Sequence, residues 1–144
     1  MSLNLVLIRG LPGSGKSTMA KKFVARGYEH FEADQYFENE DGGYVFDRRG
    51  LHHAHHQCLT KTSWYLADGK SCVVSNTFTT LEEIEPYLQA AEAAGACVYI
   101  SECTGDFGSI HDVPRTVIEN MRKRWEPLEF ILGKSGKIFI IEDN

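Results

Sequence analysis

Residues 3–8 read LNLVLI, and after Arg9 the chain continues as Gly10-Leu11-Pro12-Gly13-Ser14-Gly15-Lys16-Ser17-Thr18. The second segment satisfies the pattern G-x-x-x-x-G-K-[ST]. The apolar run predicts a strand buried on both faces, and residues 17–26 predict a helix that Gly27 ends. A strand, this loop and a helix, in that order, are the context in which the pattern forms a phosphate-binding loop, or P-loop.

Each residue type in this loop has a physical role in holding phosphate. Glycines let successive backbone N–H groups turn inward around an anion, and the helix N-terminus adds its partial positive charge. Lys16 is expected to reach the β- and γ-phosphates of a nucleotide, and the Ser17 hydroxyl is expected to ligate Mg²⁺. Residues 10–18 are therefore the predicted nucleotide-binding residues, with ATP and Mg²⁺ as cofactors. The alternative, a glycine-rich turn with a chance Lys-Ser pair, is disfavoured by the strand and helix on either side.

Strand and helix patterns alternate along the rest of the chain. Strands are predicted at residues 28–33, 71–75, 96–101 and 138–141, and helices at 47–67, 80–94 and 114–125. The helix at 80–94 opens with the capping-box pattern of Thr80 and Glu83. This alternation predicts an α/β three-layer sandwich with a central, mostly parallel sheet. No linker composition divides the chain, so we expect a single domain over residues 1–144.

Composition narrows the classes of partner. The net charge of −5, from 15 Lys and Arg against 20 Asp and Glu, argues against tight binding to long nucleic acid. It leaves room for a nucleotide, a nucleoside or a short oligonucleotide in a local pocket. Apolar runs fall far short of the roughly 20 residues of a membrane span, and residues 1–4 lack signal-peptide features. We therefore expect a cytoplasmic protein without a membrane partner. Reduced, mostly buried thiols are expected at Cys58, Cys72, Cys97 and Cys103.

Asp34 is the second candidate for chemistry. It stands at the end of the second predicted strand, and ligands of open α/β sheets bind outside the carboxyl ends of the strands. A carboxylate there could accept a proton from an attacking hydroxyl. The alternative is an aspartate that caps the following turn. Position alone does not separate these two interpretations.

Beyond the P-loop, the chain resembles the polynucleotide-kinase-like P-loop ATPases, a group related to the kinase domain of phage polynucleotide 5′-kinase/phosphatase. The resemblance extends to Pro127 and includes Asp34 with Tyr36, Tyr44-Val45-Phe46, Ala54-His55 with Cys58, Asn76-Thr77-Phe78-Thr79, Pro86-Tyr87, and Val113-Pro114 with Ile118, Met121, Trp125 and Glu126. It implies a P-loop NTPase core of the nucleoside- and nucleotide-kinase type. It also implies a phosphotransferase that moves the γ-phosphate of ATP to a hydroxyl of a nucleotide, nucleoside or oligonucleotide, with Lys16 and Asp34 as catalytic residues and Asp34 as the general base.

Three positions depart from that family's pattern. The phage enzyme has an arginine after the base motif, where Phe37 stands here. Family members often end the third strand with Asp-Asn-Thr, whereas this chain has Ser75-Asn76-Thr77, so the acid that helps to hold Mg²⁺ is missing or comes from elsewhere. The lid before the Val-Pro helix usually carries arginines, and residues 104–110 have none.

The distribution of cations leaves two functions open. No Lys or Arg occurs from residue 71 through residue 114, although phosphoryl transfer normally needs a cation at the transferred group. A replacement would have to come from a partner or from one of five arginines: Arg48, Arg49, Arg115, Arg122 and Arg124. The alternative is a nucleotide-binding or slowly hydrolysing regulatory module that transfers no phosphate.

A histidine cluster raises the question of a metal site. His52 and His56 would share one face of a helix, as a zinc pair does, with His53 and His55 beside them. No third ligand stands at a clear spacing, and His55 is expected on the apolar face, so a structural or substrate-facing role is favoured.

Three aromatic residues are expected to pack in the fold: Tyr36, Tyr44 and Phe78. For Phe78, near the carboxyl edge of the sheet, stacking on a base is the alternative.

Overall fold

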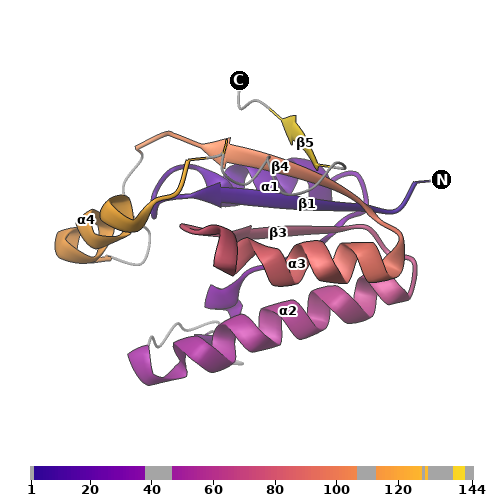
Figure 1. The fold of residues 1–144 in the computed structure, drawn as a ribbon, viewed down its shortest axis with the longest axis horizontal. Helices are drawn as coiled ribbons and strands as arrows, with labels where there is room; N and C mark the ends of the chain where they lie inside the picture. Colours follow the sequence, from indigo (N-terminus) through magenta and orange to yellow (C-terminus); the bar gives the residue numbers. More distant parts are fainter. Residues whose placement is uncertain (1, 38–46, 107–112, 128, 130–137, 142–144) are drawn as a thin grey trace.

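The computed structural model describes residues 2–37, 47–106, 113–127, 129 and 138–141 of the chain. Its strands form one parallel sheet with the order β2-β3-β1-β4-β5 (Figure 1). The strands are β1 (Asn4–Gly10), β2 (Glu29–Phe31), β3 (Cys72–Asn76), β4 (Cys97–Cys103) and β5 (Ile138–Ile141). The α-helices are α1 (Lys16–Val24), α2 (Leu51–Ala67), α3 (Leu81–Ala94) and α4 (Arg115–Arg124), and two 3₁₀ helices are η1 (Ala33–Phe37) and η2 (Arg48–Gly50).

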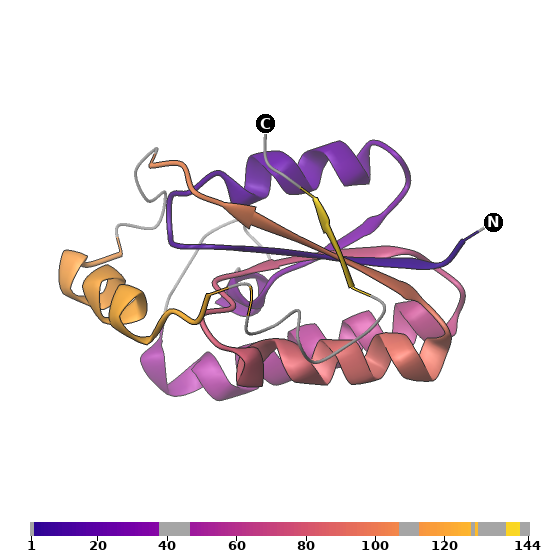
Figure 2. The same ribbon diagram turned by 45° about the horizontal axis from the view of Figure 1, so that its top comes forward.

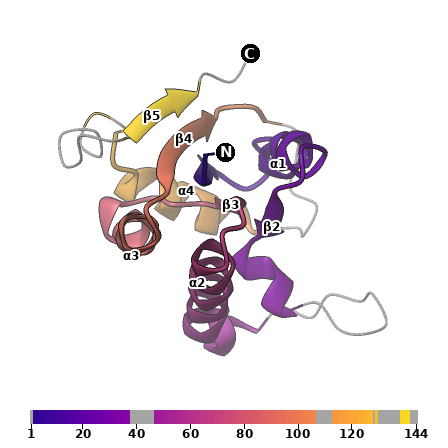
Figure 3. The same cartoon turned by 90° about the vertical axis from the view of Figure 1, so that its right-hand side faces the viewer.

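Strand β1 lies at the centre of the sheet and is buried on both faces, as its apolar sequence predicts. Leu5 and Leu7 pack in the core under α2 and α3, whereas Val6 and Ile8 pack in the core under α1. Figure 3 shows the resulting layers, with α1 on one face of the sheet and α2 and α3 on the other. This arrangement confirms the predicted three-layer sandwich.

Local sequence signals explain most of the element boundaries. Thr80 and Glu83 form both hydrogen bonds of the capping box at the start of α3, and Gly95 ends that helix in the left-handed conformation with φ 71°. The long helix, predicted from residue 47, begins at Leu51, because Asp47 caps the short helix η2 by accepting the backbone N–H of Arg49. The second strand ends at Phe31, two residues earlier than predicted, and η1 follows it.

Several other expectations can be compared with the described residues. The cysteines are free thiols, and all except the exposed Cys97 are buried. His55 is exposed, so its predicted place on the apolar face is wrong; the buried stripe of α2 is Ala54, Cys58, Thr62 and Leu66. Phe78 is buried against Tyr87, with ring centroids 5.4 Å apart, which confirms packing rather than stacking on a base. Residues 44–46 lie outside the described residues. None of the helices in the described ranges is long and apolar enough to cross a membrane.

The connections on the two sides of β1 create a crevice. The chain leaves β1 toward α1 on one face, and it leaves the adjacent β3 toward α3 on the opposite face (Figures 2 and 3). Such a topological switch point, at the carboxyl ends of the strands, is where open α/β sheets bind ligands. The backbone N–H of Gly10 donates to the carbonyl of Thr77 at 3.3 Å, so the two diverging loops touch at this point.

Arg9 joins β1 to the loop that follows β3. Its side chain is fully buried. Its Nε donates to the carbonyl oxygen of Phe78 at 3.0 Å, and its Nη2 donates to that of Thr79 at 3.3 Å. Phe78 has a φ of 46°, a left-handed conformation that disfavours residues other than glycine by about 1–3 kcal/mol. The guanidinium therefore helps to hold a strained turn.

The same guanidinium anchors the segment after α4. Arg9 Nη2 donates to the carbonyl oxygen of Glu126 at 3.0 Å, and its guanidinium carbon lies 3.9 Å from the centroid of the Trp125 ring. Glu102 of β4 contacts both groups, because its Oε1 lies 3.5 Å from Arg9 Nη1 and accepts the indole N–H of Trp125 at 3.1 Å. Burial lowers the pKa of Arg9 and the charge of Glu102 opposes that effect, but an arginine remains charged in proteins.

We predict that Arg9→Met strongly destabilises the domain. The substitution removes the Arg9 hydrogen bonds to three backbone carbonyl groups and leaves the Glu102 carboxylate without its cation, which should lower the free energy of unfolding by about 3–5 kcal/mol. Urea denaturation measures this change. Arg26→Met is the matched control, because Arg26 is exposed with its guanidinium 5.8 Å from the Phe23 ring, and we expect a change below about 1 kcal/mol. Equal effects of the two substitutions would contradict the role given to Arg9.

Candidate functional site

The predicted P-loop connects the end of β1 to the start of α1. The N–H of Ser14 donates to the carbonyl of Leu11 at 3.1 Å, which closes the turn, and Gly15 has a φ of 99° at the N-cap position of α1. Gly15 has no side chain to cap the helix, and the first turn of α1 contains no acidic residue. The N–H groups of that turn are therefore left for an anion, which the helix dipole also favours.

Lys16 lies across this loop. Its ammonium donates to the carbonyl oxygens of Gly10 at 2.8 Å and Leu11 at 3.0 Å. Burial lowers the pKa of Lys16, and negative charge at Cys103, Asp34 and Glu32 opposes that effect. Its two hydrogen bonds hold the lysine across the mouth of the loop.

Two further features fit a phosphate group. The hydroxyl of Ser14 is buried and has no hydrogen-bond partner among the described residues, and buried hydroxyls are seldom left unpaired. Ser14 Oγ lies so close to Gly10 that a Cβ at residue 10 would collide with it, and that Cβ would also lie 2.9 Å from the carbonyl oxygen of Cys103. Only glycine fits at residue 10 in this arrangement. The buried Ser14 hydroxyl remains as a polar group that an anion in the loop can satisfy.

Asp34 follows the carboxyl end of β2, and because β1, β2 and β3 are parallel, this is the edge of the sheet that carries the P-loop, as predicted. It belongs to η1 and is half-buried. The start of η1 is fixed by Asn76 at the end of β3, whose Oδ1 accepts the N–H of Ala33 at 2.8 Å. Ala33 also packs against Ala54 of α2. Asn76 is therefore a positioning residue for Asp34, and it belongs to the Asn76–Thr79 segment singled out in the sequence.

The remaining predicted residues are distributed unevenly around this edge. Ser17 and Thr18 are exposed in the first turn of α1. Helix α4, with Arg115, Arg122 and Arg124, lies beyond the carboxyl ends of β1 and β3 (Figure 1). No group of three or more His, Cys, Asp or Glu side chains that could hold a metal ion occurs among the described residues, which leaves the His52–His56 cluster without a third ligand.

Sequence reasoning missed Glu32 and its partners. Ser75 Oγ donates to Glu32 Oε2 at 3.0 Å, and His30 Nε2 lies 2.7 Å from Ser75 Oγ. The only signal in the sequence was that Ser75 stands where the resembled family often has an aspartate. This departure left open whether another acid replaces that aspartate and did not indicate which residue it is.

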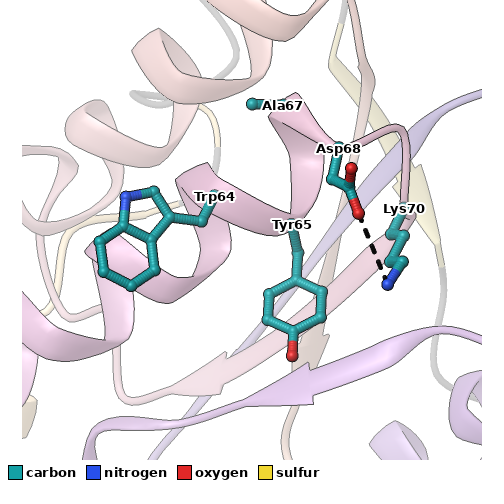
Figure 4. A pocket seen from close by; sticks show the side chains of 5 residues that line it. All are labelled: Trp64, Tyr65, Ala67, Asp68 and Lys70. Atoms are coloured by element: carbon teal, nitrogen blue, oxygen red, sulfur yellow. Dashed lines mark ion pairs between the residues drawn. The ribbon is translucent and has the colours of Figure 1, made fainter.

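A separate hollow lies at the opposite edge of the sheet. It measures about 570 Å³ and is lined by Trp64, Tyr65, Ala67, Asp68 and Lys70 at the end of α2 (Figure 4). Lys70 precedes β3, so this hollow lies at the amino end of that strand, away from the P-loop. The ion pair between Asp68 and Lys70, 3.5 Å long, is on its rim.

Comparison with protein families agrees with this site. Residues 5–110 match a family model described as an AAA domain. The chain belongs to this family. The matched range begins in β1 and includes the P-loop, η1, α2 and β3, so the AAA domain contains the elements that carry Lys16, Asp34 and Ser75.

Solved structures of low identity share the fold. A candidate kinase from Chloroflexus aurantiacus j-10-fl is 17% identical with a TM-score of 0.69, and the match covers 99% of this chain and 89% of that one. A chain of the Pnkp1/Rnl/Hen1 RNA repair complex is 16% identical with a TM-score of 0.67, over 94% of this chain and 47% of that one. Kti12 from Chaetomium thermophilum, in complex with ADP-AlF3, is 13% identical with a TM-score of 0.61, over 96% of this chain and 88% of that one. These matches confirm the predicted P-loop NTPase fold.

Proposed function

We propose that the protein binds ATP with Mg²⁺ at residues 10–18 and transfers the γ-phosphate to a hydroxyl of a nucleotide, a nucleoside or a short oligonucleotide. The observation that carries this proposal is the placement of the P-loop at the carboxyl end of β1 and of Asp34 just after the carboxyl end of β2, at one edge of a parallel sheet. In a kinase, a lysine binds the transferred phosphate and a carboxylate accepts the proton of the attacking hydroxyl.

The residues of the P-loop have separate tasks in this proposal. The N–H groups at the start of α1 and the ammonium of Lys16 bind the phosphates, and Lys16 exchanges its bonds to the carbonyls of Gly10 and Leu11 for bonds to phosphate oxygens. Ser17 would hold Mg²⁺, which neutralises charge on the β- and γ-phosphates when bound. Asp34 orients the acceptor hydroxyl and takes its proton late in the transfer.

Helix α4 is the proposed source of the missing cation. Arg124 Nε donates to Thr79 Oγ1 at 3.2 Å, so the last turn of α4 contacts the loop after β3. Arg115 and Arg122 are exposed on the same helix, at the edge that carries the P-loop (Figure 1). Arg49 is a weaker candidate, because it is paired with Asp47 at 3.0 Å.

The second candidate function is a nucleotide-binding or slowly hydrolysing module without phosphotransfer. The observation that favours it is the absence of Lys and Arg from residue 71 through residue 114. Both functions need the P-loop, and only the kinase needs Asp34 as a base.

Lys16→Ala tests nucleotide binding. Mg-ATP should raise the melting temperature of the wild-type protein by mass action, and Lys16→Ala should remove most of that rise while the domain stays folded. Lys21→Ala is the control, since Lys21 is exposed on the same helix and should leave the rise intact. A wild-type protein that shows no rise at millimolar Mg-ATP would refute nucleotide binding at this loop.

Asp34→Asn separates the two functions. The substitution keeps the shape of the side chain and removes its charge, so the transfer of label from γ-labelled ATP to an acceptor panel should fall about 100-fold or more. ATP affinity should change little, because Asp34 is not among the loop residues that hold phosphate. Asp68→Asn, on the opposite edge of the sheet, is the control and should transfer label at the wild-type rate. If Asp34→Asn transfers label as fast as the wild type, Asp34 is not the base; if the wild type transfers none to any acceptor, the binding-module function is favoured.

A further inference from the structure

Ser75 occupies the place on β3 that faces the P-loop. It pairs with Ile8 in the register of β1 and β3. Its neighbour Val74 packs under α2 and α3, so Ser75 points to the face that α1 covers. P-loop proteins hold Mg²⁺ with the Ser or Thr of the loop and with a Walker-B aspartate. A serine beside the P-loop strand supplies no charge, and the carboxylate has to come from another side chain.

Glu32 brings a carboxylate to that place. Its Oε2 accepts the hydroxyl of Ser75 at 3.0 Å and lies 3.6 Å from His30 Nε2. The side chain is 21% exposed, so the carboxylate is held by Ser75 while part of the side chain is accessible to solvent. Because Ser75 pairs with Ile8, two residues before the P-loop begins at Gly10, its hydrogen bond to Glu32 places this carboxylate beside the strand that leads into the P-loop.

His30 and Ser75 fix the orientation of this carboxylate. The single proton of the Ser75 hydroxyl is donated in the hydrogen bond to Glu32. In the hydrogen bond between His30 Nε2 and Ser75 Oγ, which are 2.7 Å apart, the histidine is therefore the donor. Hydrogen bonds of this kind orient a carboxylate toward a metal site in proteins. The hydrogen-bonded series His30–Ser75–Glu32 therefore resembles the side-chain networks that orient metal-binding carboxylates in proteins.

We infer that Glu32, held by Ser75 and His30, is the carboxylate that holds Mg²⁺ together with the Ser17 hydroxyl. The inference rests on the proposed binding of Mg-ATP at the P-loop. It gives Glu32 and Asp34 different roles at this edge. Glu32, hydrogen-bonded to Ser75 of β3, binds Mg²⁺, whereas Asp34 of η1 acts as the base for the acceptor hydroxyl.

Calorimetry of ATP binding, in EDTA and in excess Mg²⁺, tests this assignment through affinity alone. In the wild type, Mg²⁺ should tighten binding. In Glu32→Gln that tightening should fall about tenfold or more, whereas affinity in EDTA should stay equal or increase, because one negative charge near the triphosphate is gone. Glu29→Gln is the control on the same strand: Glu29 is exposed and should leave both affinities unchanged.

A second variant distinguishes the loss of a Mg²⁺-binding carboxylate from a disturbance of the local structure. Glu32→Gln/Ser75→Asp returns a carboxylate to the neighbouring strand and should restore at least part of the Mg²⁺ effect. Full Mg²⁺ tightening in Glu32→Gln, or equal losses of affinity in EDTA and in Mg²⁺ without rescue by the double variant, would overturn the assignment and leave nucleotide binding standing. A wild type that binds no ATP under either condition would overturn the assignment together with the proposed function.

Discussion

The buried guanidinium of Arg9 joins three parts of the molecule that are far apart in the sequence. It bonds the turn at Phe78, 69 residues away, and the carbonyl of Glu126, 117 residues away, and it stacks against Trp125. A charge buried this completely is tolerated only when its donors are satisfied, so these segments are held in one arrangement. Because Arg9 directly precedes Gly10, the interaction that anchors the end of α4 also fixes the first residue of the P-loop.

This constraint explains why the candidate site is assembled at one edge. The loops after β1 and β3 diverge to opposite faces of the sheet, and Arg9 ties the second loop to the first strand. At the same edge of the sheet lie the ammonium of Lys16, two carboxylates from the segment after β2 and the last turn of α4. A positive loop for phosphate beside carboxylates for a metal and a hydroxyl is the charge pattern that phosphoryl transfer requires. The carboxylates also favour the charged form of Lys16 despite its burial.

Local patterns predicted the elements, and long-range contacts decided the details of the site. The sequence predicted the P-loop, the capping box at Thr80 and the alternation of strands and helices, because these features depend on residues that are close together in the chain. The boundary of β2 depends on its pairing with β3, which ends at Phe31 and Val74 and leaves Asp34 in a 3₁₀ helix. The support of Glu32 by Ser75 joins residues 43 apart, and no sequence pattern encodes it. His55 was misplaced because the buried stripe of α2 runs through Ala54 and Cys58, one position away from it.

Amide hydrogen exchange with and without saturating Mg-ATP tests whether the carboxyl edge of the sheet is the nucleotide site. We predict slower exchange in residues 10–18, whose N–H groups would bind phosphate, and unchanged exchange in residues 64–70 around the hollow at the opposite edge. Slower exchange confined to residues 64–70, or unchanged exchange in residues 10–18 at saturating Mg-ATP, would contradict nucleotide binding at the carboxyl edge.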